Sequence, residues 1–302
     1  NLTKAKAKVV IIGHLGRPKG KDEKLSLRPV AVRLGELLGS EVQFFGDCIG
    51  EDTEAKVQDL NPGEVLVLEN LRFYKEEKEN DPRFAASLSR LGEIYVNDAF
   101  DVSHRSHASV VTLPTLLPSA IGIQFEKEIE VLKKLLDNPS HPLVVIVGGS
   151  KVATKAALVD KISKVADTVL VANLVAESIK KDNIVLSNPE KVVTSQDAVD
   201  EGLDIGPKTI KLFSSYIEKA ETVFWSGPLG KVEQEKYQEG SRKIAEAVIA
   251  SGAYSVVGGG HLDAFLGAFG FRDKFSHTST GGGALMAYMT GGVLSGLEVL
   301  KK

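Results

Sequence analysis

The chain alternates short apolar runs with longer segments whose apolar residues recur at helical spacing. The apolar runs of the first half are Val9–Ile12, Val42–Phe45, Val65–Leu68 and Ile94–Val96, and those of the second half are Leu143–Val147, Thr168–Val171, Thr222–Trp225 and Tyr254–Val257. These runs are rich in β-branched or aromatic residues and are bounded by turn residues, which is typical of strands. Because helical segments separate them, the pattern predicts parallel α/β sheets.

Local signals mark the ends of several helices. One helical pattern runs from about Ser26 to Leu38, with Ser26 as a candidate N-cap and Gly39 as a stop. Asp81-Pro82 starts another, because a capping residue is followed by a proline at the first helical position. Pro207 opens a helix in the second half, whose apolar residues lie on one stripe.

The two halves are separated by residues 111–124, which are rich in proline and leucine and have no clear period. A length of 302 residues favours about two domains. We place the boundary near residue 120, so that residues 1–120 and 121–290 form separate lobes. Residues 291–302 are expected to form a tail that could pack on either lobe.

Composition narrows the possible functions only slightly. With 43% hydrophobic residues the chain can bury a substantial core, and its net charge of −3 is not that of a nucleic-acid-binding protein. Cys48 is the only cysteine, which excludes an internal disulfide and a four-cysteine zinc site. No apolar run approaches the ~20 residues of a spanning helix, and Asn1-Leu2-Thr3-Lys4 resembles neither a signal nor a transit peptide. We therefore expect no nucleic-acid or membrane partner, and a location in the cytoplasm or an organelle matrix.

In the first half, basic residues follow the predicted strands. His14-Leu15-Gly16-Arg17-Pro18 follows the first strand, and Arg72 and Arg105 follow two others. The carboxyl ends of parallel strands meet at one edge of a sheet, where ligands bind. A planar guanidinium can fork onto a phosphate or a carboxylate. Three arginines in corresponding places therefore predict a site for a small anion.

Two histidines lie beside these arginines, in His104-Arg105-Ser106-His107. For His107 we favour a structural role, in which the ring braces the loop by hydrogen bonding. For His104 a structural role and a ligand-binding role stay equally open.

In the second half, glycine clusters follow the strands instead. They are Gly148-Gly149, Gly258-Gly259-Gly260 and Gly281-Gly282-Gly283. Glycine loops that open helices can hold phosphates with backbone N–H groups. An anion site in one half and a nucleotide-like site in the other suggest phosphoryl transfer.

The segment from Gly148 to Lys155 contains two lysines, Lys151 and Lys155, four residues apart. On a helix they would share a face, and near its N-terminus both could reach a polyphosphate. Two surface lysines on an amphipathic helix are an equally good interpretation of the spacing. The segment is not a P-loop, and no G-x-G-x-x-G follows a strand, which argues against a dinucleotide-binding dehydrogenase.

Taken together, the motifs resemble those of phosphoglycerate kinase, and they occur in the family's order over nearly the whole chain. The matching stretches are Gly13-His14-Leu15-Gly16-Arg17-Pro18-Lys19-Gly20, Leu68-Glu69-Asn70-Leu71-Arg72-Phe73, Val96-Asn97-Asp98-Ala99-Phe100, His104-Arg105-Ser106-His107-Ala108-Ser109, Gly202-Leu203-Asp204-Ile205-Gly206-Pro207-Lys208, Trp225-Ser226-Gly227-Pro228-Leu229-Gly230, Val256-Val257-Gly258-Gly259-Gly260 and Ser279-Thr280-Gly281-Gly282-Gly283-Ala284.

The resemblance implies a monomeric α/β enzyme of two lobes, each a parallel sheet flanked by helices. Its N-terminal lobe would bind the triose acid and its C-terminal lobe the nucleotide. The implied reaction transfers a phosphoryl group from 1,3-bisphosphoglycerate to ADP, giving 3-phosphoglycerate and ATP, with Mg²⁺ accompanying the nucleotide. The two lobes would have to close for this transfer.

The resemblance also implies roles for individual residues. The triose acid would be bound by His14, Arg17, Arg72, His104 and Arg105. The nucleotide would be bound by Gly149, Ser150, Lys151, Lys155, Gly206, Gly230, Glu233, Gly259 and Gly260, with Glu233 at the ribose. The transferring phosphoryl group would meet Arg17, Lys155 and the helix start at Gly281, Gly282 and Gly283. No residue is assigned as a metal ligand.

The chain departs from the family pattern at several places. The family's first strand, with its Asp-Phe-Asn motif and a further arginine, precedes the position that matches Asn1, so the resemblance implies an incomplete triose site. His261 stands where the family has the aspartate associated with magnesium, and Asp263 is expected to point elsewhere. Val171-Ala172-Asn173-Leu174 replaces a glycine-rich stretch near the adenine, and Ser226 replaces an asparagine. The stretch from residue 180 to residue 202 is shorter than usual.

Two functions therefore stay open. The first is an active phosphoglycerate kinase. The second is a catalytically weak or inactive relative, kept as a structural or regulatory subunit of a larger assembly. Basic residues and glycines such as Arg17, Lys155 and Gly281–Gly283 favour the first, whereas His261 favours the second.

Overall fold

The computed structural model describes residues 1–149 and 152–301, which form two compact units. Unit 1 comprises residues 1–98, 105–122 and 295–302, and unit 2 comprises residues 99–104 and 123–294. The segment 99–104 thus groups with unit 2, although it precedes the main division of the chain. Ser295–Lys302 groups with unit 1.

Unit 1 contains parallel strands in two separate groups. The first is a three-stranded sheet of β1 (Val9–Ile11), β3 (Val65–Leu68) and β2 (Gln43–Phe45), in that order. The second pairs β4 (Tyr95–Asn97) with β5 (Ser119–Ile121). The predicted class of parallel strands flanked by helices is confirmed, although among the described residues no ladder joins β1 to β4.

The helices of unit 1 begin and end largely at the predicted signals. They are α1 (Arg28–Leu38), α2 (Glu51–Gln58), α3 (Lys75–Lys78), α4 (Pro82–Ser89), α5 (Leu113–Leu116) and α13 (Ser295–Glu298). Gly39 ends α1 with a φ of 63°, and the Asp81 carboxylate accepts hydrogen bonds from the first turn of α4. The N-cap of α1 is Leu27 rather than Ser26, although the Ser26 hydroxyl does accept a bond from the Arg28 N–H.

Unit 2 is built on a six-stranded parallel sheet. Its strands, in spatial order, are β13 (His277–Ser279), β12 (Tyr254–Gly258), β11 (Thr222–Ser226), β6 (Leu143–Val147), β7 (Thr168–Val171) and β8 (Val192–Thr194). A small antiparallel pair, β9 (Ala198–Val199) and β10 (Asp204–Ile205), lies outside it. Strands β6, β11 and β12 are almost entirely buried, as expected for central strands covered on both faces.

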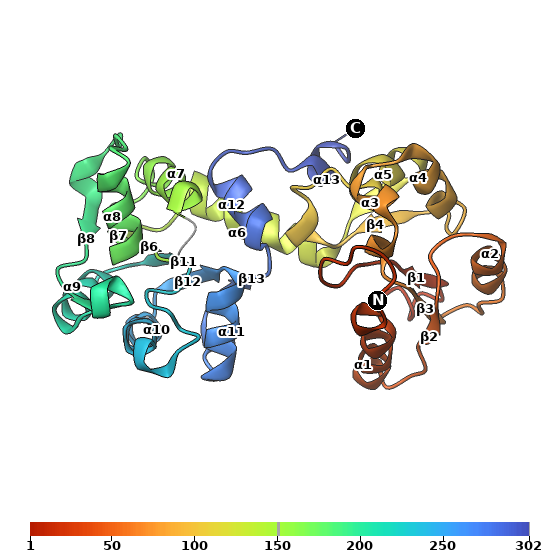
Figure 1. Ribbon diagram of the computed structural model, residues 1–302, viewed down its shortest axis with the longest axis horizontal. Coiled ribbons are helices and arrows are strands. Elements are labelled where there is room, and N and C mark those ends of the chain that lie inside the picture. Colours follow the sequence, from red (N-terminus) through yellow and green to blue (C-terminus); the bar gives the residue numbers. More distant parts are fainter. Residues whose placement is uncertain (150–151, 302) are drawn as a thin grey trace. The chain divides into compact units, whose positions relative to one another are not determined.

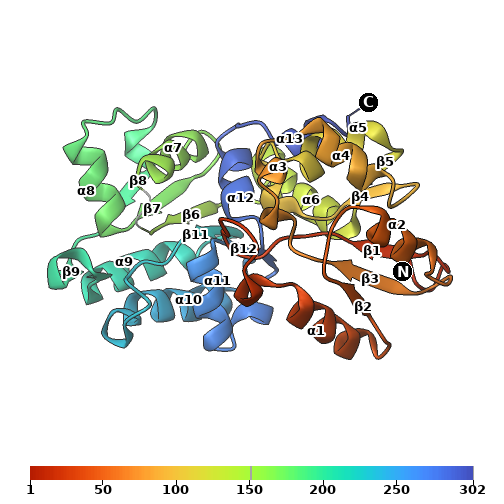
Figure 2. The same ribbon diagram turned by 45° about the vertical axis from the view of Figure 1, so that its right-hand side comes forward.

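Helices flank this sheet. They are α6 (Ile123–Asp137), α7 (Val152–Ile162), α8 (Asn173–Lys181), α9 (Pro207–Ile217), α10 (Glu239–Ser251), α11 (Gly260–Ala268) and α12 (Gly282–Met289). Figures 1 and 2 show α9, α10 and α11 on one side of the sheet, and α7, α8 and α12 toward the other. The core on the α9–α11 side includes Trp225, Phe213, Ile244 and Leu262, all completely buried.

The parallel order places the carboxyl ends of β6, β11, β12 and β13 along one edge of the sheet of unit 2. The loops that leave these ends carry the glycine clusters that the sequence singles out. This edge is therefore the place to look for an anion site in unit 2.

Candidate active site

In unit 1, hydrogen bonds join the loop after β1 to the loop after β3. Arg72 is buried, and its Nη1 donates to the Gly16 carbonyl oxygen at 2.8 Å. The Asn70 side chain accepts from the Arg72 N–H at 3.0 Å and donates to the Leu15 carbonyl oxygen at 2.8 Å. Arg72 is thereby fixed beside the segment that carries His14 and Arg17.

His14 lies in a positively charged environment. Burial and the charges of Arg72, His107 and Arg105 together lower the pKa of His14 to about 4, against an opposing effect of Glu77. The ring is therefore neutral at pH 7 and can donate one hydrogen bond and accept another. Arg72 and Arg105 are therefore among the charges that act on the His14 ring, and their convergence on one ligand stays a prediction.

The remaining basic residues of the patch differ in their surroundings. The Arg105 Nε is buried, with no hydrogen-bond partner among the described residues, whereas the Arg17 side chain is exposed. His107 is buried 3.6 Å from the Glu77 carboxylate, which also accepts from the Ser109 N–H and hydroxyl. At 3.6 Å the contact between His107 and Glu77 is too long for a hydrogen bond, so the bracing role of His107 stays a prediction.

In unit 2, three glycine loops meet so closely that side chains are excluded. The Gly148 N–H donates to the Ser226 carbonyl oxygen at 3.0 Å, and the Gly227 N–H donates to the Gly258 carbonyl oxygen at 3.2 Å. A Cβ at Gly148 would lie 2.2 Å from the Pro228 carbonyl oxygen. The loops after β6, β11 and β12 therefore form one continuous backbone surface.

Lys155, on α7, is buried against this surface. Its Nζ donates to the Ser226 hydroxyl at 2.7 Å and to the Ser226 carbonyl oxygen at 3.0 Å, and it lies 3.9 Å from the Met286 Sδ. Gly149 has a φ of +92°, which favours glycine, and a Cβ there would lie 3.8 Å from the Lys155 Cε. The two other predicted residues of this loop, Ser150 and Lys151, lie outside the described residues.

A buried carboxylate positions the start of α12. Glu128, on α6, accepts from the Thr280 N–H at 2.9 Å, from the Thr280 hydroxyl at 3.1 Å, and lies 3.2 Å from the His277 Nε2. Burial alone would raise the pKa of Glu128, but hydrogen bonds from His277, Ser279 and Thr280 bring it below its usual value. The charged carboxylate thus holds the loop that leads into Gly281. The sequence patterns do not reveal Glu128, because it lies inside an ordinary amphipathic helix.

The glycines at this helix start also permit close contacts. A Cβ at Gly281 would lie 2.3 Å from the Phe100 ring, and one at Gly283 would lie 2.7 Å from the His104 Nε2. The structure therefore places His104 beside the start of α12, within unit 2. His104 thus groups with unit 2, whereas the other four predicted triose residues group with unit 1.

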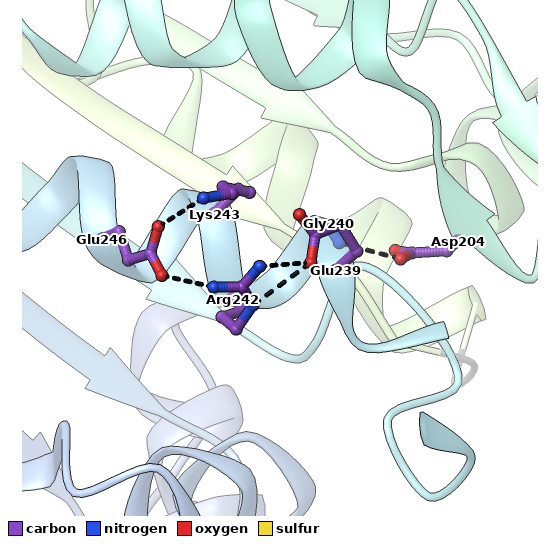
Figure 3. Close-up of polar contacts among 6 residues, drawn as sticks. All are labelled: Asp204, Glu239, Gly240, Arg242, Lys243 and Glu246. Atoms are coloured by element: carbon purple, nitrogen blue, oxygen red, sulfur yellow. Dashed lines mark hydrogen bonds and ion pairs between the residues drawn. The ribbon is translucent and has the colours of Figure 1, made fainter. Parts of the chain in front are cut away.

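At two of the glycines predicted to bind the nucleotide, close packing explains why no larger residue fits. A Cβ at Gly206 would lie 2.4 Å from the Asp197 carboxyl carbon, and one at Gly230 would lie 2.4 Å from the Asp204 Oδ1. Asp204 also accepts from the Gly240 N–H at 2.8 Å, at the start of α10 (Figure 3). Burial raises the pKa of Asp204 to about 6, although hydrogen bonds from Gly240 and Ile205 oppose the shift.

His261 pairs with the carboxylate that the resemblance assigns to the ribose. The His261 Nδ1 lies 2.5 Å from the Glu233 Oε1, in the first turn of α11, and both side chains are largely exposed. The Glu233 pKa is lowered by a backbone hydrogen bond and by His261. Gly259, with a φ of +117°, and Gly260 form the turn that enters α11. Asp263 instead pairs with Arg272 at 2.6 Å, so it does point elsewhere.

The residues present at this position do not match a magnesium site. Magnesium prefers oxygen ligands in octahedral geometry, and here an imidazole occupies the position next to Glu233. Among the described residues, no group of three or more His, Cys, Asp or Glu side chains is arranged to hold a metal ion. The same residues contain no helix that is both long enough and apolar enough to span a membrane.

The stretch that the resemblance places near the adenine, residues 171–174, carries larger side chains than glycine. The Asn173 Nδ2 donates to the Asp204 carbonyl oxygen at 3.1 Å, so this side chain is used in packing α8 against β10. Leu174 is 40% exposed and Ala172 is buried. The Asn173 side chain is therefore used in a structural hydrogen bond, and the Leu174 side chain points partly into solvent.

Comparison with known proteins gives a consistent result. The family model described as phosphoglycerate kinase matches residues 1–186 and 175–292. The phosphoglycerate kinase of Dictyoglomus turgidum is 39% identical over 340 residues, covering 98% of this chain and 86% of the relative. That of Borrelia hermsii is 38% identical over 341 residues, covering 98% of this chain and 87% of the relative.

Solved structures agree with the sequence relatives. The crystal structure of phosphoglycerate kinase from Pyrococcus horikoshii has a TM-score of 0.87 at 30% identity, covering 99% of this chain and 88% of that chain. The enzyme from Coxiella burnetii has a TM-score of 0.80 at 30% identity, covering 99% and 87%. With a family model and relatives that span nearly its whole length, this chain belongs to the phosphoglycerate kinase family of phosphotransferases.

Proposed function

We propose that this chain transfers a phosphoryl group between 1,3-bisphosphoglycerate and ADP, and that its two units bind the two substrates. The observation that carries the proposal is the junction in unit 2 where the buried Lys155 meets the glycine loops and α12. Phosphoryl transfer needs positioning and charge stabilisation more than covalent chemistry. A lysine, backbone N–H groups and a helix start supply both.

In this proposal, unit 1 binds the triose acid through His14, Arg17, Arg72 and Arg105. The buried Arg105 Nε supports an anion there, because a buried donor without a protein partner costs free energy until a ligand or water accepts its bond. The neutral His14 adds a hydrogen bond without adding charge. His104 acts from unit 2, beside Gly283.

Unit 2 binds the nucleotide through Gly149, Ser150, Lys151, Lys155, Gly259 and Gly260, with Gly206, Gly230 and Glu233 toward the nucleoside. Lys155 and the N–H groups of Gly281–Gly283 stabilise the transferring phosphoryl group. Magnesium bound to the nucleotide would supply neutralisation of phosphate charge. We assign no magnesium ligand in this chain, and we assign its function to a monomer in the cytoplasm or an organelle matrix.

The test is a coupled assay of ATP formation from 1,3-bisphosphoglycerate and MgADP, with calorimetry of each substrate. Turnover that saturates in both substrates is expected. Binding of 3-phosphoglycerate without any turnover would favour the structural or regulatory alternative, for which the specific observation is the His261–Glu233 pair at the nucleotide site.

A further inference from the structure

The Lys155 ammonium is held by residues that belong to two different elements. Its contacts include the hydroxyl and carbonyl oxygens of Ser226, the last residue of β11, and the Sδ of Met286 on α12. The Ser226 hydroxyl also lies 3.5 Å from the Met286 Sδ. Ser226 is buried, so its hydroxyl is not exchanging this contact for bulk water.

The place of this contact along α12 matters for the reaction. Met286 is four residues after Gly282, so it lies on the same face of the helix, one turn further on. Lys155 thus contacts α12 through a residue one turn after the helix start that receives the phosphoryl group in the proposed function. Glycine at position 227 leaves space for the ammonium, because a Cβ there would crowd the Lys155 Nζ at 3.2 Å.

We propose that Ser226 is a positioning residue for Lys155: its hydroxyl fixes the ammonium at the carboxyl end of β11 and so sets how the charge is presented to the transferring phosphoryl group. The inference rests on the proposed function and extends it to a residue that the sequence analysis does not assign to either substrate site. The carbonyl contact is available to any residue at position 226, whereas the hydroxyl contact depends on the side chain.

The test compares Ser226→Ala with Ser255→Ala, a matched control. Ser255 is also buried, on the adjacent strand β12, but it lies at the opposite end of the sheet, where its hydroxyl accepts from the Ser276 N–H. A lost hydrogen bond to a charged group predicts that Ser226→Ala lowers kcat about tenfold with KM for MgADP within about twofold. The control should leave both constants unchanged.

A second measurement reports the position of Lys155 without turnover. Acylation by a water-soluble succinimidyl acetate, followed by peptide mapping, gives the labelling rate of Lys155 itself. We expect this rate to rise about fivefold to tenfold in Ser226→Ala, because the ammonium loses the free energy of one hydrogen bond that holds it in place. The rate should stay constant in Ser255→Ala. A purely structural serine would change the unfolding temperature without this selective exposure of one lysine.

If Ser226→Ala does not fold, the isosteric pair Ser226→Thr and Ser226→Val replaces it, because only threonine keeps the hydroxyl. Equal labelling and equal kcat in that pair, or a loss confined to KM, would overturn the proposal. If the parent chain shows no phosphoryl transfer, the proposed function fails, while the labelling rates still decide whether Ser226 holds Lys155.

Discussion

In both units the candidate anion-binding groups lie at the carboxyl ends of parallel strands, but the groups differ in kind. In unit 1, the patch consists of side chains: Arg72 is tied to Gly16, and His14 is kept neutral by burial and positive charge. In unit 2, the surface is mostly backbone, and the only side chain that we place at its centre is Lys155. The first arrangement suits a small acid with fixed charges, and the second suits a phosphoryl group whose charge spreads during transfer.

The difference also determines how each site tolerates change. A guanidinium can be shortened or removed without moving the backbone, so unit 1 should lose affinity first. A methyl group at Gly148 or Gly283 would meet another atom within 2.7 Å, so unit 2 should lose geometry first. The predictions below test this contrast, beginning with the largest expected effect.

Lys155→Met should lower kcat by about 100-fold or more, because removing one donor that stabilises transition-state charge costs that much. Methionine keeps most of the buried volume, so KM for MgADP should change by no more than about threefold. Steady-state kinetics in the coupled assay measure both constants. Lys161→Ala, an exposed lysine of the same helix, is the control. Equal losses in kcat and in nucleotide affinity would reassign Lys155 to simple binding.

Arg72→Ala should weaken 3-phosphoglycerate binding by about 1.5–3 kcal/mol, the range for a hydrogen bond to a charged group. Arg72→Lys should recover little of this, since an ammonium lacks the guanidinium fork. Calorimetry on both variants checks the prediction, with the exposed Arg90→Ala as control. Unchanged affinity in Arg72→Ala would remove Arg72 from the site.

Much of unit 2 can be predicted from the sequence, because its central strands are continuous apolar runs. Leu143–Val147 and Thr168–Val171 match β6 and β7, and β11 and β12 extend one residue further than predicted. Strands β8 and β13 are not predicted, since each has only three residues, too few to show a periodicity, and all three residues of β13 are polar.

Long-range partners are harder to predict than elements. Strand β5 lies in the proline-rich stretch near residue 120, where its three residues show no alternation that could distinguish them from a loop. The contact of Glu128 with Thr280 spans 152 positions, and that of Lys155 with Ser226 spans 71. Nothing in local spacing encodes such pairs, so the sequence identifies the glycine loops and not the side chains that position them.

The stability of unit 1 should fall as the pH falls from 7 to 5. The pKa of His14 is about 4 in the folded chain, compared with the ordinary value of 6.5 that applies to the unfolded chain, so folding favours the neutral ring. The contribution is fully present above pH 6.5 and is lost as the pH falls toward 4, which amounts to about 1–2 kcal/mol between pH 7 and pH 5. Hydrogen exchange of the β3 amides measures the stability of unit 1 alone. Tryptophan fluorescence would not, because Trp225, the only tryptophan, lies in unit 2. His14→Asn should flatten this dependence, and a His14 pKa near 6.5 by NMR would contradict it.

The smallest expected effect concerns His261 and bears on the two alternative functions. His261→Asp places a second carboxylate beside Glu233, which lies 2.5 Å from the present ring. The two negative charges repel each other in the absence of a cation, so ADP alone should bind more weakly to the variant. Magnesium prefers such oxygen ligands, so MgADP should bind about two- to fivefold more tightly. His261→Asn, which has nearly the same size but no charge, should show neither change. Titration of ADP and MgADP into all three proteins decides: a parent chain that binds MgADP at micromolar concentration and turns over would exclude the inactive alternative.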